Sequence, residues 1–165
     1  MRLLILALFT APFFLPEQRG PVHVGGMHMS YEITNDSVTI SLSAPTTGWV
    51  GIGFNQENNI LESDLLLFHV IEGKASGLDL FVKGIGDPRK DTDLNGHTSF
   101  RMLEGKEENG QTEVQFRIAL DSQDPNDYQH TLSESFWLIL AYSAHDDFEH
   151  HSLMRRHVPF VFEPK

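Results

Sequence analysis

The chain contains no cysteine among its 165 residues. Disulfides, cysteine-ligated zinc, iron–sulfur clusters, thiolate nucleophiles and covalently attached haem are therefore excluded. A metal ion could be held only by histidine, methionine, carboxylate or backbone oxygen. Basic residues are also few, because 12 Lys and Arg stand against 23 Asp and Glu and leave a formal net charge of −11. That charge repels nucleic acid and anionic lipid surfaces, so we expect neither as a partner.

Long apolar runs are scarce as well, and the one that stands out is at the N-terminus. Met1 and Arg2 precede an apolar segment at residues 3–14, the pattern of a signal peptide. We predict residues 1–16 as a signal peptide or a retained apolar segment, and residues 21–165 as a single domain. No later run approaches the roughly 20 apolar residues of a membrane span. The mature chain is therefore expected without a membrane span, as a secreted, periplasmic or cell-surface protein.

Beyond Gly20, apolar and polar residues alternate with period two, and no helical stripe is present. The segments 38–44 and 112–120 alternate most clearly, as half-buried strands do, while the apolar runs at 65–68 and 136–140 predict strands covered on both faces. Strands are expected near 26–33, 38–44, 48–55, 64–70, 78–83, 98–103, 112–120, 136–142 and 158–162. A single sheet would leave an apolar face in water. The expected strands therefore predict an all-β, immunoglobulin-like sandwich of two sheets with about nine to eleven mostly antiparallel strands.

A family resemblance follows from motifs in a fixed order. These are GWVGIGFN at 48–55, SDLLL at 63–67, LDLF at 78–81 with Pro88 and Asp91, FRIALDSQD at 116–124 with Asp127, LILAY at 138–142, and DDF at 146–148 with His151 and Arg155. Together they resemble the DOMON domain over about residues 27–162. The resemblance implies an extracytoplasmic β-sandwich that binds haem or a sugar and serves in redox reactions or in recognition, not in catalysis by itself. We therefore do not expect an enzyme.

The resemblance also implies where a haem would bind. Haem-binding members, such as the cytochrome domain of cellobiose dehydrogenase, hold a b-type haem between one methionine and one histidine. The corresponding positions here are His151, with His150 beside it, and Ile60 or Leu61 in place of the methionine. Neither aliphatic side chain can ligate iron. Three alternatives stay open: haem held by His151 alone or with Met27, Met29 or Met154, a different ligand, and a site that has been lost.

Histidines are dense near the C-terminus, at positions 145, 150, 151 and 157, and acidic residues stand among them. Imidazole nitrogens at this density could ligate a first-row divalent metal, with His151 as the first candidate. A solvated polar loop is the alternative, because the spacing matches no zinc motif. Arg155 and Arg156 could reach haem propionates or a sugar acid, or could only compensate the local acidic charge.

Aromatic residues supply a further candidate contact. Trp49, Phe54 and Trp137 could stack on a sugar or a porphyrin, although strand aromatics are mainly core residues. Gly51 and Gly53 share a strand face with Trp49 and predict room there for a ring or for a close backbone neighbour.

The segment DTDLNG at 91–96 reproduces the first half of a calcium loop. Met102 replaces the glutamate of the second half, so we interpret the segment as an Asx-rich turn.

The sequence therefore predicts an exported ligand-binding module whose site lies at the loop end that holds His151. Haem is the first candidate ligand, with electron transfer to a redox partner protein as the possible role. Carbohydrate binding is the alternative, and surface recognition without a small ligand is the third hypothesis.

Overall fold

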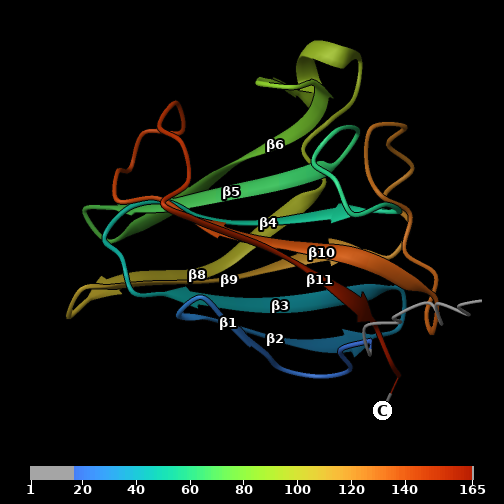
Figure 1. Cartoon of the computed structure of the whole chain (residues 1–165), viewed down its shortest axis with the longest axis horizontal. Helices are drawn as coiled ribbons and strands as arrows, with labels where there is room; N and C mark the ends of the chain where they lie inside the picture. The colour runs from blue at the N-terminus through green and yellow to red at the C-terminus, as the bar shows by residue number, and fades with distance from the viewer. Residues whose placement is uncertain (1–16, 165) are drawn as a thin grey trace, which may run out of the picture.

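The computed structural model describes residues 17–164, which form two stacked antiparallel sheets (Figure 1). The five-stranded sheet has the order β1-β2-β3-β9-β8, and the six-stranded sheet has the order β11-β10-β4-β5-β6-β7. The elements are β1 (Val22–Val24), β2 (Met27–Thr34), β3 (Ser37–Ala44), β4 (Val50–Asn55), β5 (Asp64–Ile71), β6 (Lys74–Gly84), β7 (Asp87–Lys90), the 3₁₀ helix η1 (Asp91–Leu94), β8 (Phe100–Glu108), β9 (Gln111–Ala119), β10 (Ser135–Tyr142) and β11 (Met154–Val161). The predicted signal peptide at residues 1–16 lies outside the described residues.

The predicted all-β sandwich is confirmed, and two short strands add to the nine expected ones. β1 and β7 have three and four residues, too few to show a period of two, and each lies at the edge of its sheet. β7 also contains Pro88, which lacks a backbone donor and is tolerated at a sheet edge. No helix in the described part of the chain has the length and apolar character needed to cross a membrane.

The core lies between the two sheets and is built from the inward-facing residues of the strands, which alternate with outward-facing ones along each strand. Its largest fully buried side chains include Phe54, Phe68, Phe116, Phe160 and Phe162. Phe68 of β5 and Phe116 of β9 bring their ring centroids to 4.3 Å, which joins one sheet to the other. Aromatic contacts of this kind add to the apolar burial that holds a sandwich together.

The expectation that residues 65–68 are covered on both faces is wrong in part. Leu66 and Phe68 are buried, but Leu65 and Leu67 point to the other face and are only half-buried. Their side chains lie over Gly53 and Gly51, where an added Cβ would overlap the leucine methyl groups. The room predicted beside Trp49 is therefore filled by two leucines of the same sheet.

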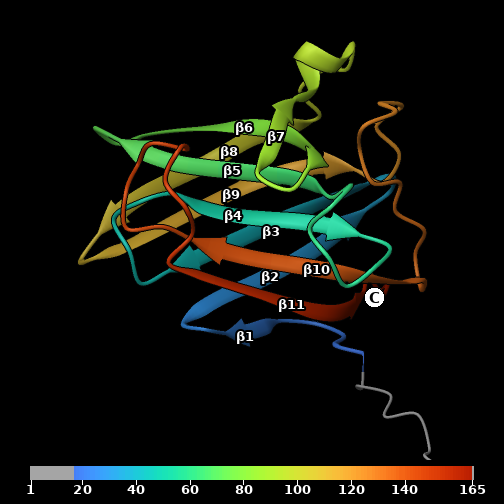
Figure 2. The same ribbon diagram turned by 45° about the horizontal axis from the view of Figure 1, so that its top comes forward.

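The pairing of β4 with β10 decides which loops lie at the same end of the sandwich. Trp137 pairs with Asn55 and Tyr142 pairs with Val50, so the two strands run in opposite directions. The loops at 56–63 and 120–134 therefore lie at one end, which we call the Asp64 end. The loop at 143–153 lies at the other, the His151 end, as Figures 1 and 2 show.

Candidate functional site

The loop at the His151 end is held in place by Trp49, which is buried in the structure. The indole Nε1 donates to the carbonyl of His150 at 3.2 Å, and the backbone N–H of Trp49 donates to the carbonyl of His145 at 3.0 Å. Trp49 is thus a structural anchor for the loop, and its ring is not presented to solvent for stacking on a ligand.

The loop brings part of the predicted histidine cluster together. Ligand atoms of His145, Asp147 and His150 lie within 4.8 Å of one another, and all three residues are exposed. His150 Nδ1 lies 2.6 Å and 2.7 Å from the two carboxylate oxygens of Asp147, and this hydrogen bonding lowers the pKa of Asp147. The rings of His145 and His150 stack at 4.0 Å. His151, the predicted metal ligand, is exposed and stands outside this group.

The predicted sulfur ligands and arginines have ordinary surroundings. Met27 and Met29 are core residues, and Met154 is buried against the backbone of Gly25, where an added Cβ would overlap its side chain. Arg155 and Arg156 are exposed. Within residues 17–164 neither arginine forms an ion pair with an acidic residue.

The positions that the resemblance implied for a six-coordinate haem are not brought together. Ile60 and Leu61 lie in the 56–63 loop at the Asp64 end, whereas His151 lies at the opposite end, with the six residues of β4 between the two ends. Two cavities, one at the Asp64 end and one on the five-stranded sheet, are described below, and none of these three residues lines either of them. The residues at these positions therefore do not fit a haem held between them.

A cavity of about 850 Å³, open to solvent, lies over the outer face of the five-stranded sheet and extends to the β5–β6 turn. Hydrogen-bonding side chains from several strands line it, among them His28, Ser30, Ser41, Ser43, Glu113 and Gln115. Gln115 Nε2 donates to Ser41 Oγ at 3.0 Å. The sequence pattern did not predict this cavity, because alternating serines on β3 match any solvated sheet face.

Five aspartates from four segments meet at the Asp64 end. Asp64 begins β5, Asp79 lies in β6, Asp91 begins η1, and Asp124 and Asp127 belong to the loop before β10. Carboxylate oxygens of Asp64, Asp79 and Asp127 lie within 4.8 Å of one another, and so do those of Asp91, Asp124 and Asp127. We call these five residues the aspartate cluster.

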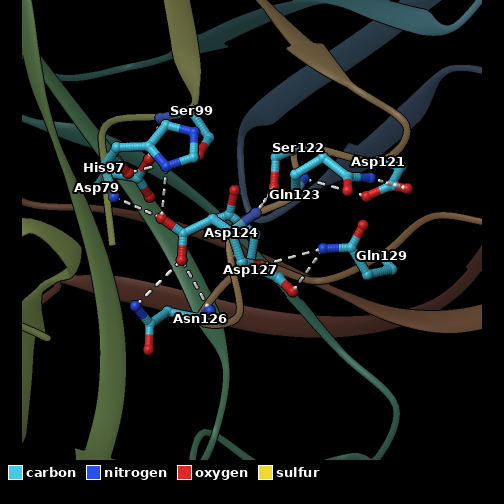
Figure 3. Close-up of polar contacts among 10 residues, drawn as sticks. All are labelled: Asp79, His97, Ser99, Asp121, Ser122, Gln123, Asp124, Asn126, Asp127 and Gln129. Atoms are coloured by element: carbon cyan, nitrogen blue, oxygen red, sulfur yellow. Dashed lines mark hydrogen bonds and ion pairs between the residues drawn. The ribbon is translucent and has the colours of Figure 1, made fainter. Parts of the chain in front are cut away.

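Backbone donors hold some of these carboxylates in place. Tyr128 N donates to Asp64 Oδ2 at 3.0 Å and Ser99 N donates to Asp79 Oδ2 at 2.7 Å. Asp124 has the fullest set of partners (Figure 3), with donors from His97 and Asn126. An added Cβ at Gly96 would overlap the Asp124 carboxylate, so glycine is needed at this close approach.

Other oxygens of the aspartate cluster are buried without a donor. Among the described residues, one oxygen each of Asp64, Asp79 and Asp127 and both oxygens of Asp91 lack a hydrogen-bond partner. Burial raises the pKa of Asp64 well above its usual range, that of Asp79 to about 7 and that of Asp91 to about 8, and the neighbouring aspartates add to each shift.

The sequence contains a signal for this cluster that the predicted sites did not include. Asp64 directly precedes the apolar run at 65–68 and Asp79 stands within the apolar segment at 78–82, and a charged residue at an inward-facing strand position requires a partner. The interpretation of residues 91–96 as a turn agrees with the 3₁₀ helix found there, and Asp93 is exposed. Of the residues in that motif, Asp91 alone joins the cluster.

The described residues form an all-β domain of two stacked sheets. The model of the DOMON domain matches residues 23–143, so the chain belongs to the DOMON family. The match includes the whole aspartate cluster and ends before the 143–153 loop is complete.

Three known proteins illustrate the relationship. MOXD1 homolog 2 of Drosophila melanogaster is 28% identical over 116 residues, which are 70% of this chain and 15% of that protein, so the chain spans a small part of this relative. The cytochrome domain of Myriococcum thermophilum cellobiose dehydrogenase has a TM-score of 0.56 at 12% identity, over 81% of this chain and 74% of that one. The cytochrome b domain of pyranose dehydrogenase from Coprinopsis cinerea has a TM-score of 0.55 at 12% identity, over 82% and 75%. At these identities the two structures establish the shared fold.

Proposed function

We propose that this DOMON domain is an exported binding module, without catalytic activity of its own, that takes a carbohydrate in the cavity on the outer face of the five-stranded sheet. The observation that carries the proposal is the cavity itself. Its volume of about 850 Å³ falls in the range of about 300–1,000 Å³ that small-molecule sites occupy, which is room for one or a few sugar rings.

The lining of the cavity favours a ligand rich in hydroxyl groups. The lining offers both hydrogen-bond donors and acceptors along β3, β9 and β8. They are serine hydroxyls, the Gln115 amide, and Lys106 and Glu113, whose Nζ and Oε2 form an ion pair at 3.3 Å. A sugar hydroxyl both donates and accepts hydrogen bonds, so it can pair with each of these groups. Recognition would then rest mainly on hydrogen bonds, because no Phe, Tyr or Trp ring of the described residues lines this cavity.

Two variants on one strand test the proposal. Gln115 and Arg117 both face outward from β9, and only Gln115 lines the cavity. With a sugar selected from a broad glycan panel, we expect Gln115→Ala to weaken the affinity by about tenfold, the effect of one lost hydrogen bond, and Arg117→Ala to leave it unchanged. Absence of retention on every glycan, or equal losses in both variants, would refute the proposal.

Haem binding with electron transfer is the second candidate function, and the shared fold with two cytochrome domains favours it. A bound haem would supply one-electron redox chemistry. Met154 begins β11 at the His151 end, so it is the sulfur residue to test with His151. Haem binding predicts a Soret band after addition of hemin, seen in oxidised and dithionite-reduced protein and shifted in His151→Ala and Met154→Ala but not in Met29→Leu. A colourless protein that ignores hemin would exclude this candidate.

A further inference from the structure

We infer that the aspartate cluster is a binding site for a divalent metal ion, with calcium as the ion that its donors suit best. The site is separate from the cavity of the proposed function. Burial, missing hydrogen-bond partners and available space support it.

The fold collects a large negative charge at the Asp64 end. Five carboxylates lie in two overlapping groups within ligand distance, and Asp127 belongs to both. The basic side chain in contact with them among the described residues is that of His97, which is 59% exposed and lies 3.1 Å from Asp124 Oδ2. Asp124 already has backbone and side-chain donors, and Asp64 and Asp79 each have one backbone donor. One exposed histidine and these donors leave most of the negative charge of the five carboxylates unbalanced.

The individual oxygen atoms of the cluster lack partners. Asp91 is 1% exposed, and within residues 17–164 neither of its carboxylate oxygens has a hydrogen-bond donor. Asp64 and Asp79, at 7% and 4% exposed, each leave one buried oxygen without a donor. A buried carboxylate without a partner is costly, so a cation or a proton at these oxygens would lower the free energy of the folded state.

Space for an ion lies beside these oxygens. A cavity of about 10 Å³ is lined by Asp64, Asp79 and Asp127, together with Ser99 and Tyr128. That volume admits about one water molecule or one metal ion. Three of the residues with an unpartnered oxygen, Asp64, Asp79 and Asp127, therefore line the space for an ion, and Asp91 lies outside its lining.

The donor chemistry selects the class of ion. All five side chains offer hard carboxylate oxygens, and the cluster contains no sulfur or imidazole donor. Calcium takes six to eight oxygen ligands in flexible geometry, whereas magnesium demands a strict octahedron and keeps several waters. Ligands from β5, β6, η1 and the 120–134 loop can supply such a number, with Asp127 as the shared ligand between the two groups.

Protons are the rival occupants. Two carboxyl groups in contact can share a proton, and the raised pKa values of Asp79 and Asp91 agree with partial protonation near neutral pH. The two alternatives differ in what they respond to. A metal site responds to calcium at constant pH, whereas a set of protonated carboxyls responds to pH alone.

The experiment measures the thermal midpoint of the complete, chelator-treated protein at pH 7.4 with and without calcium chloride. An ion that binds only the folded state at about one hundred times its Kd raises the midpoint by about 5–10 °C for a chain of this size. Terbium gives an independent readout, because Tyr128 lies beside Asp64 and can sensitise its luminescence. We expect both signals, with magnesium weaker than calcium.

Two substitutions complete the test. Asp127→Asn removes the shared ligand with little change in shape, and we expect it to abolish the calcium-dependent shift and the terbium signal. It also relieves repulsion, so the calcium-free variant should be at least as stable as the calcium-free native protein. Asp93→Asn, which changes an exposed acid of η1 outside the cluster, should respond to calcium as the native protein does. The inference is overturned if the native protein ignores both ions, if Asp127→Asn still responds, or if only acidification stabilises the fold.

Discussion

The buried imidazole of His130 makes a strong prediction about acid stability. His130 is 8% exposed and lies among the rings of Phe54, Tyr128, Phe136 and Phe162 at centroid distances of 4.6 to 5.2 Å. Its Nδ1 has no partner among the described residues. Burial in this aromatic environment lowers the pKa of His130 from 6.5 to about 3.

The sign of the effect follows from which state binds the proton. In the unfolded chain the imidazole takes up a proton as the pH falls below 6.5, whereas in the folded chain it stays neutral until about pH 3. The contribution of His130 to stability is therefore complete above pH 6.5 and is lost as the pH falls. The loss approaches about 1.4 kcal/mol per pH unit below pH 6.5, or about 2–3 kcal/mol in all between pH 7 and 4.5.

The assay compares the native protein with His130→Leu, which removes the ionisable group and keeps an apolar side chain of similar size. The free energy of unfolding is measured in urea from pH 7 to 4.5, with chelator present. Asp79 and Asp91, whose pKa values are raised, gain protons on folding and act in the opposite direction, but they do so in both proteins. The difference between the two proteins should therefore shift by about 2–3 kcal/mol in favour of the variant. A difference that stays constant with pH would show that the folded imidazole is charged, and a neutral buried His130 would be refuted.

Three further predictions concern the framework of the domain, each measured by urea unfolding. Gly48→Ala should cost about 1–3 kcal/mol and displace the 143–153 loop, because the new Cβ would overlap the backbone of His145; unchanged amide NMR shifts in that loop would contradict it. Thr112→Val should cost about 1–3 kcal/mol, since the buried hydroxyl of Thr112 lies 3.0 Å from the carbonyl of Thr46 and 3.1 Å from that of Gly48, and a neutral result would mean that water replaces it. Phe116→Ala should cost about 3–5 kcal/mol through the core cavity, and a loss below about 1 kcal/mol would show that the two sheets can close over it.

The alternation of side chains along the chain was enough to predict the architecture. Residues such as Val38, Ile40 and Leu42 can be buried together only on one face of a strand, and many such faces require a second sheet to cover them. The short strands β1 and β7 were missed because three or four residues contain too little of this pattern.

The location of the sites depended on how distant segments pair. The antiparallel register of β4 and β10 places the 56–63 loop and His151 at opposite ends, and no property of either segment alone shows this. Trp49 likewise offers an aromatic ring in the sequence, but its hydrogen bonds to the 143–153 loop make it a buried anchor.

The aspartate cluster shows where local patterns stop and tertiary structure begins. Side-chain periodicity reports on neighbours two residues apart, so it predicted the sandwich and the strands that carry Asp64 and Asp79, but not which face of those strands is buried. It carries no information about which carboxylates meet across segments as far apart as Asp64 and Asp127. Only the stacking of the sheets and the path of the loop before β10 brought these charges within ligand distance of one another, because contacts of that range are formed by the packing of the whole chain.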